Sequence, residues 1–319
     1  MVIDRDSRVF VAGHGGLVGS AIVRRLKRDG FTNLFTATRA ELDLRNQLEV
    51  TRWFEENRPD HVFLVAGTVG GIMANSTRPA EFIYDNMMIH GTVVHAAHLC
   101  GVSKLLYLGS SCIYPRNADQ PISEKALLTG PLEPTNEAYA IAKIAGIKLC
   151  QSYREQYGSD FISAMPTNLY GPNDNFDLTS SHVLPALMRK FHDARASDDK
   201  VVEVWGTGAP RREFLHVDDL ADACLFLMDN YSDVGHVNIG TGVDLPIGKL
   251  AAKIRDIVCP DATVQFDASK PNGMPRKVLD TSKLNRLGWE PTIDLEDGIT
   301  TTYAWFREQI AADLTVRGA

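Results

Sequence analysis

The sequence predicts an α/β protein: a doubly wound parallel sheet joined to a smaller carboxyl-terminal α/β domain. Two observations carry this prediction. Short apolar runs alternate with helical segments up to about residue 170, which is typical of a parallel sheet covered by helices on both faces. Beyond residue 172 the alternation changes, and proline-punctuated and charged segments follow. We expect residues 1–172 to form a nucleotide-binding domain, re-entered at about 212–242, and residues 173–319 to form mainly a substrate domain.

The bulk composition excludes several classes of protein. With 319 residues, 44% hydrophobic and 23% charged, the chain is long enough for two cores and is not disordered. No apolar run approaches the ~18 residues of a membrane span, and no signal peptide is visible, so a cytoplasmic location is expected. The net charge of −7 disfavours nucleic acid as a partner. Five widely spaced cysteines predict neither a zinc site nor a disulfide framework.

The first strand–helix unit carries a glycine motif. Arg8–Ala12 reads as a strand and Ser20–Arg28 as an amphipathic helix, with Gly13, Gly16 and Gly19 between them. Their spacing is G-x-x-G-x-x-G, whereas the usual dinucleotide motif is G-x-G-x-x-G. Glycine at such places permits a tight turn and close approach to a pyrophosphate, which the helix N-terminus attracts. We therefore expect a Rossmann-like dinucleotide site here.

The second strand bears on the choice of cofactor. It spans Leu34–Thr38 and ends at Arg39, about 20 positions after Gly19, where NAD enzymes often place an acid for the ribose 2′-hydroxyl. Arginine suits a 2′-phosphate, which favours NADP. A solvated arginine at a strand end is the alternative, and Glu41 and Asp43 nearby weaken the preference.

Two more strands end in loops that suit a ligand, since ligands bind at the carboxyl ends of such strands. After a helix at Gln47–Asn57, the strand His61–Ala66 leads into the glycine-rich loop at 67–71. The following helix, Ala80–Leu99, is rich in histidine. No carboxylate completes a ligand set there, so we predict a packed or interface helix and no metal.

The strand Lys104–Leu108 leads into a turn that carries hydroxyls and a thiol. Ser110 can hydrogen-bond a substrate oxygen together with a tyrosine. Cys112 is open to two interpretations. It is either a small buried residue, as free cysteines commonly are, or an acid–base group with a tuned thiol pKa.

The helix that begins near Asn136 carries Tyr139 and Lys143 on one face, one turn apart. A tyrosine pKa near ~10 makes a poor acid at pH 7. An adjacent ammonium is expected to lower that pKa and to suit the phenol for proton transfer. The alternative is a surface Tyr–Lys pair.

The second half is expected to hold a mixture of short elements. After a strand at Phe161–Pro166, we predict helices at Val183–His192, Ile247–Ile257 and Leu295–Ile310, strands at Val201–Trp205 and Val237–Gly240, a helix opened by 211–219, and a loop over 266–277.

Cations gather in this half of a net acidic protein: Arg189, Lys190, Arg211, Arg212, Lys270, Arg276 and Lys277. They are either scattered solvated charges or a pyrophosphate cradle, since arginine forks match phosphate oxygens. Trp205 beside them could pack on a base or sugar.

Taken together, Gly13–Gly19, Gly109–Cys112 and the Tyr139/Lys143 pair resemble the extended short-chain dehydrogenase/reductase family. Further stretches resemble, within that family, enzymes that epimerise GDP-4-keto-6-deoxy-D-mannose at C3 and C5 and reduce C4 with NADPH. These stretches are residues 69–72, 132–137, 166–172, 212–219 and 267–271, and the similarity runs from about residue 8 to about 306.

The resemblance implies catalytic roles. Cys112 is similar to the family's base and His182 to its acid. Tyr139 donates a proton to the C4 oxygen, Lys143 lowers the tyrosine pKa and holds the ribose, and Ser110 polarises the ketone. Without the resemblance, His182 reads as a lone surface histidine.

The resemblance also implies binding residues. Those for NADP are Gly13, His14, Gly15, Gly16, Leu17, Val18, Gly19, Arg39, Ala40, Glu41, Leu42, Asp43, Leu44, Leu108, Gly109, Ser110, Ser111, Lys143, Pro166, Thr167, Asn168, Leu169 and His182. Those for the GDP-linked substrate are Lys190, Trp205, Arg212, Asn272 and Lys277. The family forms homodimers through the helices at 80–99 and 139–157.

Three residues depart from the family pattern. Gly15 stands where arginine is common, which leaves Arg39 to favour NADP and makes NADH a weaker alternative donor. Lys190 replaces an arginine and Asn272 an aspartate, and both changes bear on GDP binding.

Rival interpretations remain within the same scaffold. A dehydratase would be expected to show an acid pair after a threonine where Ser-Ser-Cys stands at 110–112, and a 4-epimerase needs no epimerising thiol. A non-catalytic NADP-binding protein would typically have lost Tyr139 or Lys143, and both are present.

Overall fold

The computed structural model describes residues 3–270 and 272–312. Its main sheet is six-stranded and parallel, in the order β2-β1-β3-β4-β5-β9. The strands are β1 Val9–Ala12, β2 Leu34–Phe35, β3 His61–Leu64, β4 Lys104–Leu108, β5 Phe161–Pro166 and β9 Val237–Ile239. The strand order reverses at β1 and β3, and ligands bind at such switch points in doubly wound sheets.

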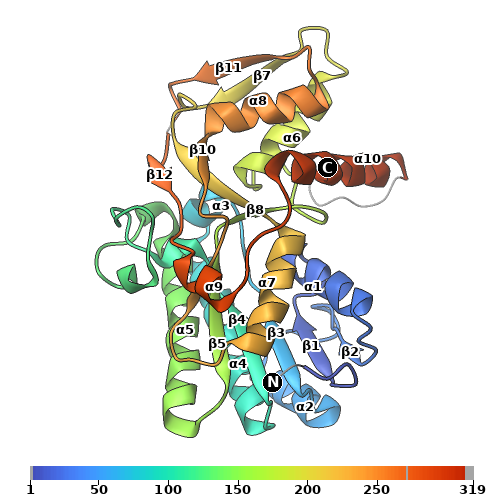
Figure 1. The fold of residues 1–319 in the computed structure, drawn as a ribbon, viewed down its shortest axis with the longest axis vertical. Helices are drawn as coiled ribbons and strands as arrows, with labels where there is room; N and C mark the ends of the chain where they lie inside the picture. Colours follow the sequence, from blue (N-terminus) through green and yellow to red (C-terminus); the bar gives the residue numbers. More distant parts are fainter. Residues whose placement is uncertain (1–2, 271, 313–319) are drawn as a thin grey trace.

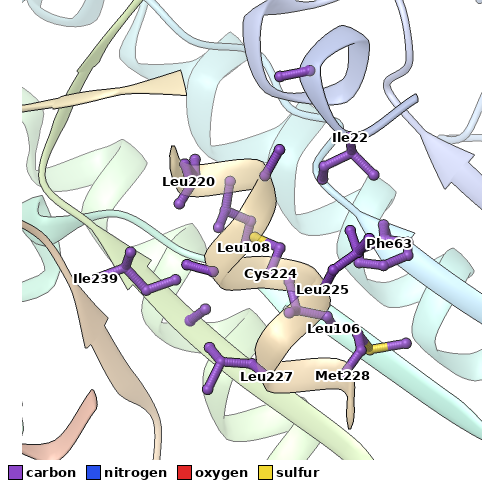
Figure 2. Close-up of a cluster of buried hydrophobic side chains, with 14 of the residues drawn as sticks. Ile22, Phe63, Leu106, Leu108, Leu220, Cys224, Leu225, Leu227, Met228 and Ile239 are labelled. Atoms are coloured by element: carbon purple, nitrogen blue, oxygen red, sulfur yellow. The ribbon is translucent and has the colours of Figure 1, made fainter. Parts of the chain in front are cut away.

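Helices cover both faces of this sheet because its strands alternate their side chains between two cores. Val9 and Val11 of β1 belong to one apolar cluster, and Phe10 and Ala12 to the other. The first face is covered by α1 Leu17–Arg28, α7 Val217–Asn230 and α9 Ser282–Leu287; the second by α2 Gln47–Asn57, α4 Pro79–Leu99 and α5 Glu137–Tyr157 (Figure 1). Figure 2 shows the apolar side chains of α7, including Leu220, Cys224 and Met228, in one buried cluster with Leu106 and Leu108 of the sheet.

A second group of elements stands at one end of the main sheet, at the top of Figure 1. A small sheet has the order β10-β8-β12, with β6 also paired to β8, and β7 and β11 form a parallel pair. These strands are β6 Asn168–Tyr170, β7 Val201–Trp205, β8 Arg211–His216, β10 Asp244–Pro246, β11 Thr263–Asp267 and β12 Arg276–Lys277. The helices α6 Val183–Ala194, α8 Ile247–Val258 and α10 Leu295–Ala311 enclose a third apolar core with them.

The predicted fold class is confirmed, but several short elements differ from the sequence predictions. The segment 211–216 is the strand β8, not the opening of a helix, and the predicted loop at 266–277 begins in β11 and ends in β12. Their partners are distant in sequence, so no local periodicity marks them. The second strand ends at Phe35 rather than at residue 38. A short helix, α3 Ile72–Thr77, was not expected. Among the described helices, none is long and apolar enough to cross a membrane.

Candidate functional site

The turn after β1 is built by glycines that have no room for a side chain. A Cβ at Gly19 would lie 2.1 Å from the Gly13 carbonyl oxygen, and one at Gly13 would lie 2.7 Å from Ala66 Cα. Gly13 also has a φ of +97°, which side chains rarely adopt. The turn therefore fixes α1 tightly against β1 and the end of β3.

The other side of the same turn is open. A Cβ at Gly15 would meet nothing within 4 Å, and Gly16 caps α1 without any side-chain hydrogen bond to the first-turn amides. The buried Nδ1 of His14 has no partner among the described atoms. Free amides at the start of a twelve-residue helix favour an anion. The residues present therefore fit a dinucleotide pyrophosphate. Leu17–Gly19 form the first turn of α1, whereas the sequence prediction began this helix at Ser20.

The segment from Arg39 to Leu44 is a turn, because β2 ends early. Glu41 accepts hydrogen bonds from the Thr38 amide at 2.7 Å and the Thr38 hydroxyl at 2.8 Å. Asp43 is held by Arg45, whose bonds bring the Asp43 pKa down to about 2. The sequence analysis missed Arg45, which also bridges to Asp85 at 2.8 Å. The Asp43 carboxylate also interacts electrostatically with Arg39, so it partly offsets the positive charge that Arg39 offers to a 2′-phosphate.

The remaining predicted cofactor residues lie at strand ends. Leu108 and Gly109 end β4, and Gly109 leaves no space for a Cβ beside the Met165 sulfur, at 2.2 Å. Pro166 ends β5, and Thr167–Leu169 run on into β6. Leu42 is buried in the core rather than free to line a site. The glycine turn, β4 and β5 thus present their ends at one edge of the sheet.

Lys143 is buried on α5, with its ammonium aimed at the end of β4. Its Nζ donates to the Leu108 carbonyl at 2.8 Å and lies 5.2 Å from the centroid of the Tyr107 ring and 5.8 Å from that of Tyr139. A Cβ at Gly146 would lie 2.4 Å from Tyr107, so only glycine lets α5 approach β4 so closely. Burial lowers the Lys143 pKa to about 8.

The pKa of Tyr139 moves opposite to the sequence prediction. Burial raises it above the ordinary value, with the Cys112 thiol adding to the rise, and only a hydrogen bond with Ser110 opposes them. The desolvation that removes water from around the phenol thus outweighs the hydrogen bond with Ser110. A raised pKa favours the protonated phenol over the phenolate at neutral pH.

Cys112 lies in the 3-10 turn Ser111–Ile113 that follows β4, capped by Ser110. Its thiol is 8% exposed, and burial raises its pKa. The ammonium groups of Lys277 and Lys143 and a hydrogen bond with Ser110 oppose that rise. The turn thus brings together Ser110, Cys112, Tyr139 and Lys143 as expected from the sequence.

His182 is the N-cap residue directly before α6, and it is exposed. Its side chain is accessible to solvent although protein surrounds it, and its pKa is lowered by burial and by Lys277. The glycine-rich loop holds this segment in place, since the Gly71 amide donates to the Ser180 carbonyl at 2.9 Å. The positive charge of Lys277 favours the lower pKa of both His182 and Cys112.

The predicted cation cluster is smaller than its sequence suggests. Arg211 and Arg276 both pair with Asp244, and Arg189 pairs with Asp193 along α6. The sequence analysis missed Asp244, which is remote from each arginine in the chain. The other four cations are Lys190, Arg212, Lys270 and Lys277. The Lys190 ammonium donates to the Glu203 carbonyl at 2.8 Å, and the Arg212 guanidinium donates to the Met274 carbonyl at 2.6 Å.

Two of these four cations lie near the aromatic ring of Trp205. The ammonium of Lys190 lies 5.9 Å from the centroid of its ring and that of Lys270 lies 5.6 Å away. The ring is 52% exposed. Nearby, Asn272 accepts from the Thr207 amide at 2.8 Å and hydroxyl at 3.1 Å, so its oxygen is used within the protein. An exposed aromatic face flanked by ammonium groups suits a base or sugar next to phosphate.

Metal-binding groups are sparse in the described part of the chain. Within residues 3–270 and 272–312, no three histidine, cysteine, aspartate or glutamate side chains are placed to hold a metal ion. All five cysteines are free thiols.

Comparison with known sequences agrees with this geometry. The Epimerase family model, described as the NAD dependent epimerase/dehydratase family, matches residues 9–240. The chain is 58% identical to GDP-L-fucose synthase 1 of Arabidopsis thaliana, over 96% of this chain and 95% of that protein. It is 55% identical to GDP-L-fucose synthase of Escherichia coli strain K12, over 94% and 97%.

Solved structures of enzymes that act on GDP-linked sugars share the fold of this chain. A GDP-L-fucose synthetase from Naegleria fowleri bound to NADP has a TM-score of 0.91 at 30% identity, covering 99% of this chain and 98% of that one. A GDP-6-OMe-4-keto-L-xylo-heptose reductase from Campylobacter jejuni has a TM-score of 0.93 at 39% identity, covering 97% and 100%. The chain therefore belongs to the NAD dependent epimerase/dehydratase family and, within it, to the GDP-L-fucose synthases.

Proposed function

We propose that this protein converts GDP-4-keto-6-deoxy-D-mannose to GDP-L-fucose by epimerisation at C3 and C5 followed by NADPH-dependent reduction at C4. The observation that carries the proposal is the grouping of Ser110, Cys112, Tyr139 and Lys143 at the carboxyl end of β4, with His182 exposed directly before α6. Relatives at 55–58% identity bear the name of this activity.

The epimerase step uses the thiol and the imidazole. The 4-ketone acidifies the hydrogens at C3 and C5. The Cys112 thiolate takes one proton, the electron pair of the broken C–H bond enters an enolate, and His182 returns a proton to the opposite face. The neutral thiol and imidazole then exchange protons with water before the second centre reacts. Cys112 and His182 are thus assigned as base and acid.

The reductase step uses the hydroxyl groups. Bound NADPH supplies the hydride for C4. Ser110 donates a hydrogen bond to the ketone oxygen, and Tyr139 delivers a proton to it as the charge develops. Its raised pKa keeps the phenol protonated until that moment. Lys143, fixed by Leu108, holds the cofactor ribose and compensates the phenolate that remains.

The cofactor and the substrate contact different residues of this site in the proposal. The Gly13–Gly19 turn holds the dinucleotide, with NADPH preferred through Arg39 and NADH accepted as a weaker donor. Lys190, Trp205, Arg212 and Asn272 bind the GDP moiety. In this scheme residues 1–172 and about 212–242 serve the cofactor, and the rest of 173–319 serves the substrate, although residues 313–319 lie outside the described structure.

The proposal is tested by incubating the protein with GDP-4-keto-6-deoxy-D-mannose in D₂O, with and without NADPH, and following the sugar by NMR. Deuterium at C3 and C5, with GDP-L-fucose formed only when NADPH is present, is the expected result. Cys112→Ser should suppress the exchange. No exchange and no product would overturn the proposal.

A reductase of another GDP-linked keto sugar is the second candidate. The observation that favours it is the similarity to the Campylobacter jejuni heptose reductase, whose name specifies another GDP-linked 4-keto sugar as its substrate. The same NMR experiment separates the two, since a pure reductase gives a C4-reduced product without deuterium at C3 or C5.

We also propose a cytoplasmic homodimer formed through α4 and α5. These two helices pack together, and their outer surfaces carry several exposed large side chains. They are Tyr84, Met87, Leu99, Ile141 and Tyr157. Such side chains suit close isologous packing against a second copy. Light scattering that finds only monomers at micromolar concentration would overturn this part of the proposal.

A further inference from the structure

We propose that Tyr114 and Asn238 are positioning residues, whose mutual hydrogen bond holds the Cys112 turn where epimerisation needs the thiol. This inference rests on the proposed function, in which Cys112 is the base. Three sets of contacts support the role: those at the two ends of the turn, those of the Asn238 amide, and those that join the loop after the turn to the segment after β12.

The turn that carries Cys112 is held at both ends. Its start is fixed to the main sheet, because the Gly109 amide donates to the Ala164 carbonyl of β5 at 2.8 Å. Its end is Tyr114, the residue directly after the 3-10 turn, whose ring is buried. The Tyr114 hydroxyl donates to Asn238 Oδ1 of β9 at 2.5 Å. Since one residue separates Tyr114 from Cys112, this bond limits where the thiol can lie.

Asn238 is fully buried, and both ends of its side-chain amide are hydrogen-bonded. Its Nδ2 donates to the Ile122 carbonyl at 2.9 Å and to the Asp280 carbonyl at 3.2 Å. These two acceptors fix the orientation of the amide, so Oδ1 is the atom that faces the Tyr114 hydroxyl. Loss of that hydroxyl would leave a buried acceptor without its donor.

His236 completes the surroundings of the Tyr114 hydroxyl. Its Nε2 lies 3.0 Å from the phenolic oxygen. Because the phenolic hydrogen goes to Asn238, the imidazole is the donor of this second bond. Burial lowers the pKa of His236 to about 4, so the ring is neutral at pH 7 and has one N–H to donate. The hydroxyl thus donates and accepts among buried groups, and a phenylalanine ring could do neither.

Asn238 also joins the loop after the thiol to the segment after β12. The Ile122 carbonyl accepts from the Asp280 amide at 2.9 Å, and the Ile122 amide donates to the Val278 carbonyl at 2.8 Å. The backbone amide of Asn238 donates to Glu124 Oε1 at 3.1 Å. Since β9 is the last strand in the order of the main sheet, these bonds tie both segments to its end strand. One asparagine therefore holds two stretches that are remote in the chain.

Removal of the hydroxyl tests this arrangement without changing the shape of the ring. In Tyr114→Phe, Asn238 Oδ1 loses its donor, and a buried acceptor without a partner destabilises the closed turn. This cost falls when the turn moves away from β9 or when water enters. Either change displaces Cys112 from the sugar, whereas Tyr139 stays fixed on α5. Epimerisation should therefore suffer more than reduction.

The first measurement is backbone hydrogen exchange of the full-length protein, followed peptide by peptide by mass spectrometry. In Tyr114→Phe, residues 112–122 should exchange about tenfold faster than in the wild type, because the loss of a bond to a buried acceptor shifts local opening by that order. Peptides of α7, which covers the other face of the sheet, should keep their rates. Faster exchange throughout the chain would overturn the proposal, because the bond would then stabilise the whole fold rather than the turn.

The wild type provides a test that needs no variant. Residues 112–124 and 278–283 should lose their protection together in mild urea, because the Asn238 amide bonds both segments. Independent opening of the two segments would overturn the proposal.

The second measurement is the product ratio with GDP-4-keto-6-deoxy-D-mannose and NADPH in D₂O. Reduction before epimerisation gives a C4-reduced sugar without deuterium at C3 or C5, and this fraction should rise in Tyr114→Phe. Deuterium exchange without NADPH should fall about tenfold. Tyr303→Phe is the matched control, because it removes a hydroxyl of a buried tyrosine in the third core that also contacts His192 and Arg195. It should change neither the ratio nor the exchange of the turn.

Equal hydrogen exchange of the turn in the wild type and Tyr114→Phe would overturn the proposal, because the bond would then not hold the turn. A faster turn with an unchanged product ratio would overturn it too, since the bond would serve stability alone. Hydrogen exchange needs no sugar. A wild type that neither exchanges C3 and C5 nor forms GDP-L-fucose would therefore count against the proposed function and not against the hold of Tyr114 on the turn.

Discussion

The cofactor side and the substrate side of the proposed site are built in opposite ways. The cofactor side rests on a local turn, in which Gly13 and Gly19 pack within seven residues of each other and leave the helix amides open. The substrate side rests on β8 and β12, which place Arg212 beside Lys277 although 65 positions separate them. Local geometry fixes the first side, and pairing across the chain fixes the second. The two sides should therefore respond differently to substitution.

Tyr139→Phe should give the largest effect and separate the two chemistries. Loss of the phenolic proton should lower reduction by about 10²- to 10⁴-fold, since that is the usual contribution of a positioned acid. Deuterium exchange at C3 and C5 should persist, because Cys112 and His182 are untouched. NMR of the sugar and NADPH absorbance measure both rates. If reduction and exchange fall equally, the division of roles is wrong.

Gly19→Ala tests how rigid the local turn is. The new Cβ would lie 2.1 Å from a backbone oxygen, so we expect a loss of about 1–3 kcal/mol or more in unfolding free energy and a loss of NADPH binding. Gly15→Ala is the matched control, with nothing within 4 Å of its Cβ and an expected change within about 0.5 kcal/mol. Equal melting temperatures for the two variants would contradict the packing argument.

These differences explain how much could be predicted from the sequence. The glycine turn and the Tyr139/Lys143 pair follow from short spacings, and the long helices at 47–57 and 80–99 follow from local pattern. The sequence did not predict strands β8 and β12, because charged residues interrupt their apolar pattern and their pairing partners are remote in the chain. Likewise, no spacing shows that burial raises the Tyr139 pKa. The family resemblance supplied the roles of Cys112 and His182, which the fold alone would leave as a buried thiol and a surface histidine.

Asp244→Asn tests the non-local side. Asp244 pairs with both Arg211 and Arg276, which the β8–β12 register sets side by side. Without the carboxylate these cations repel each other, so GDP should bind about fivefold to tenfold more weakly, because a lost charge-assisted bond costs about 1–2 kcal/mol. NADPH binding should not change. Calorimetry with each nucleotide measures both, and Asp261→Asn at an exposed pair with Lys200 is the control.

The same carboxylate predicts a pH dependence of stability. Its pKa is lowered to about 2, against about 3.9 in an unfolded chain. A group with a lowered folded pKa stabilises the protein above its unfolded pKa and loses that effect as pH falls toward the folded pKa. The stability difference between wild type and Asp244→Asn should be constant above about pH 5 and shrink between about pH 4 and pH 2. Urea unfolding at pH 7, 5 and 3 checks this, and a difference that grows on acidification would contradict it.

Gly15→Arg should give the smallest effect and sharpen the comparison on the cofactor side. Asp43 interacts with Arg39 electrostatically, so the attraction of Arg39 for a 2′-phosphate is partly offset. A second arginine at the open position 15 adds an exposed charge contact of about 0.4–1 kcal/mol. The ratio of kcat/KM for NADPH over NADH should therefore rise about twofold to fivefold, and fall back in high salt. A ratio that stays constant would place the 2′-phosphate away from Gly15, leaving Arg39 as the group that selects the cofactor.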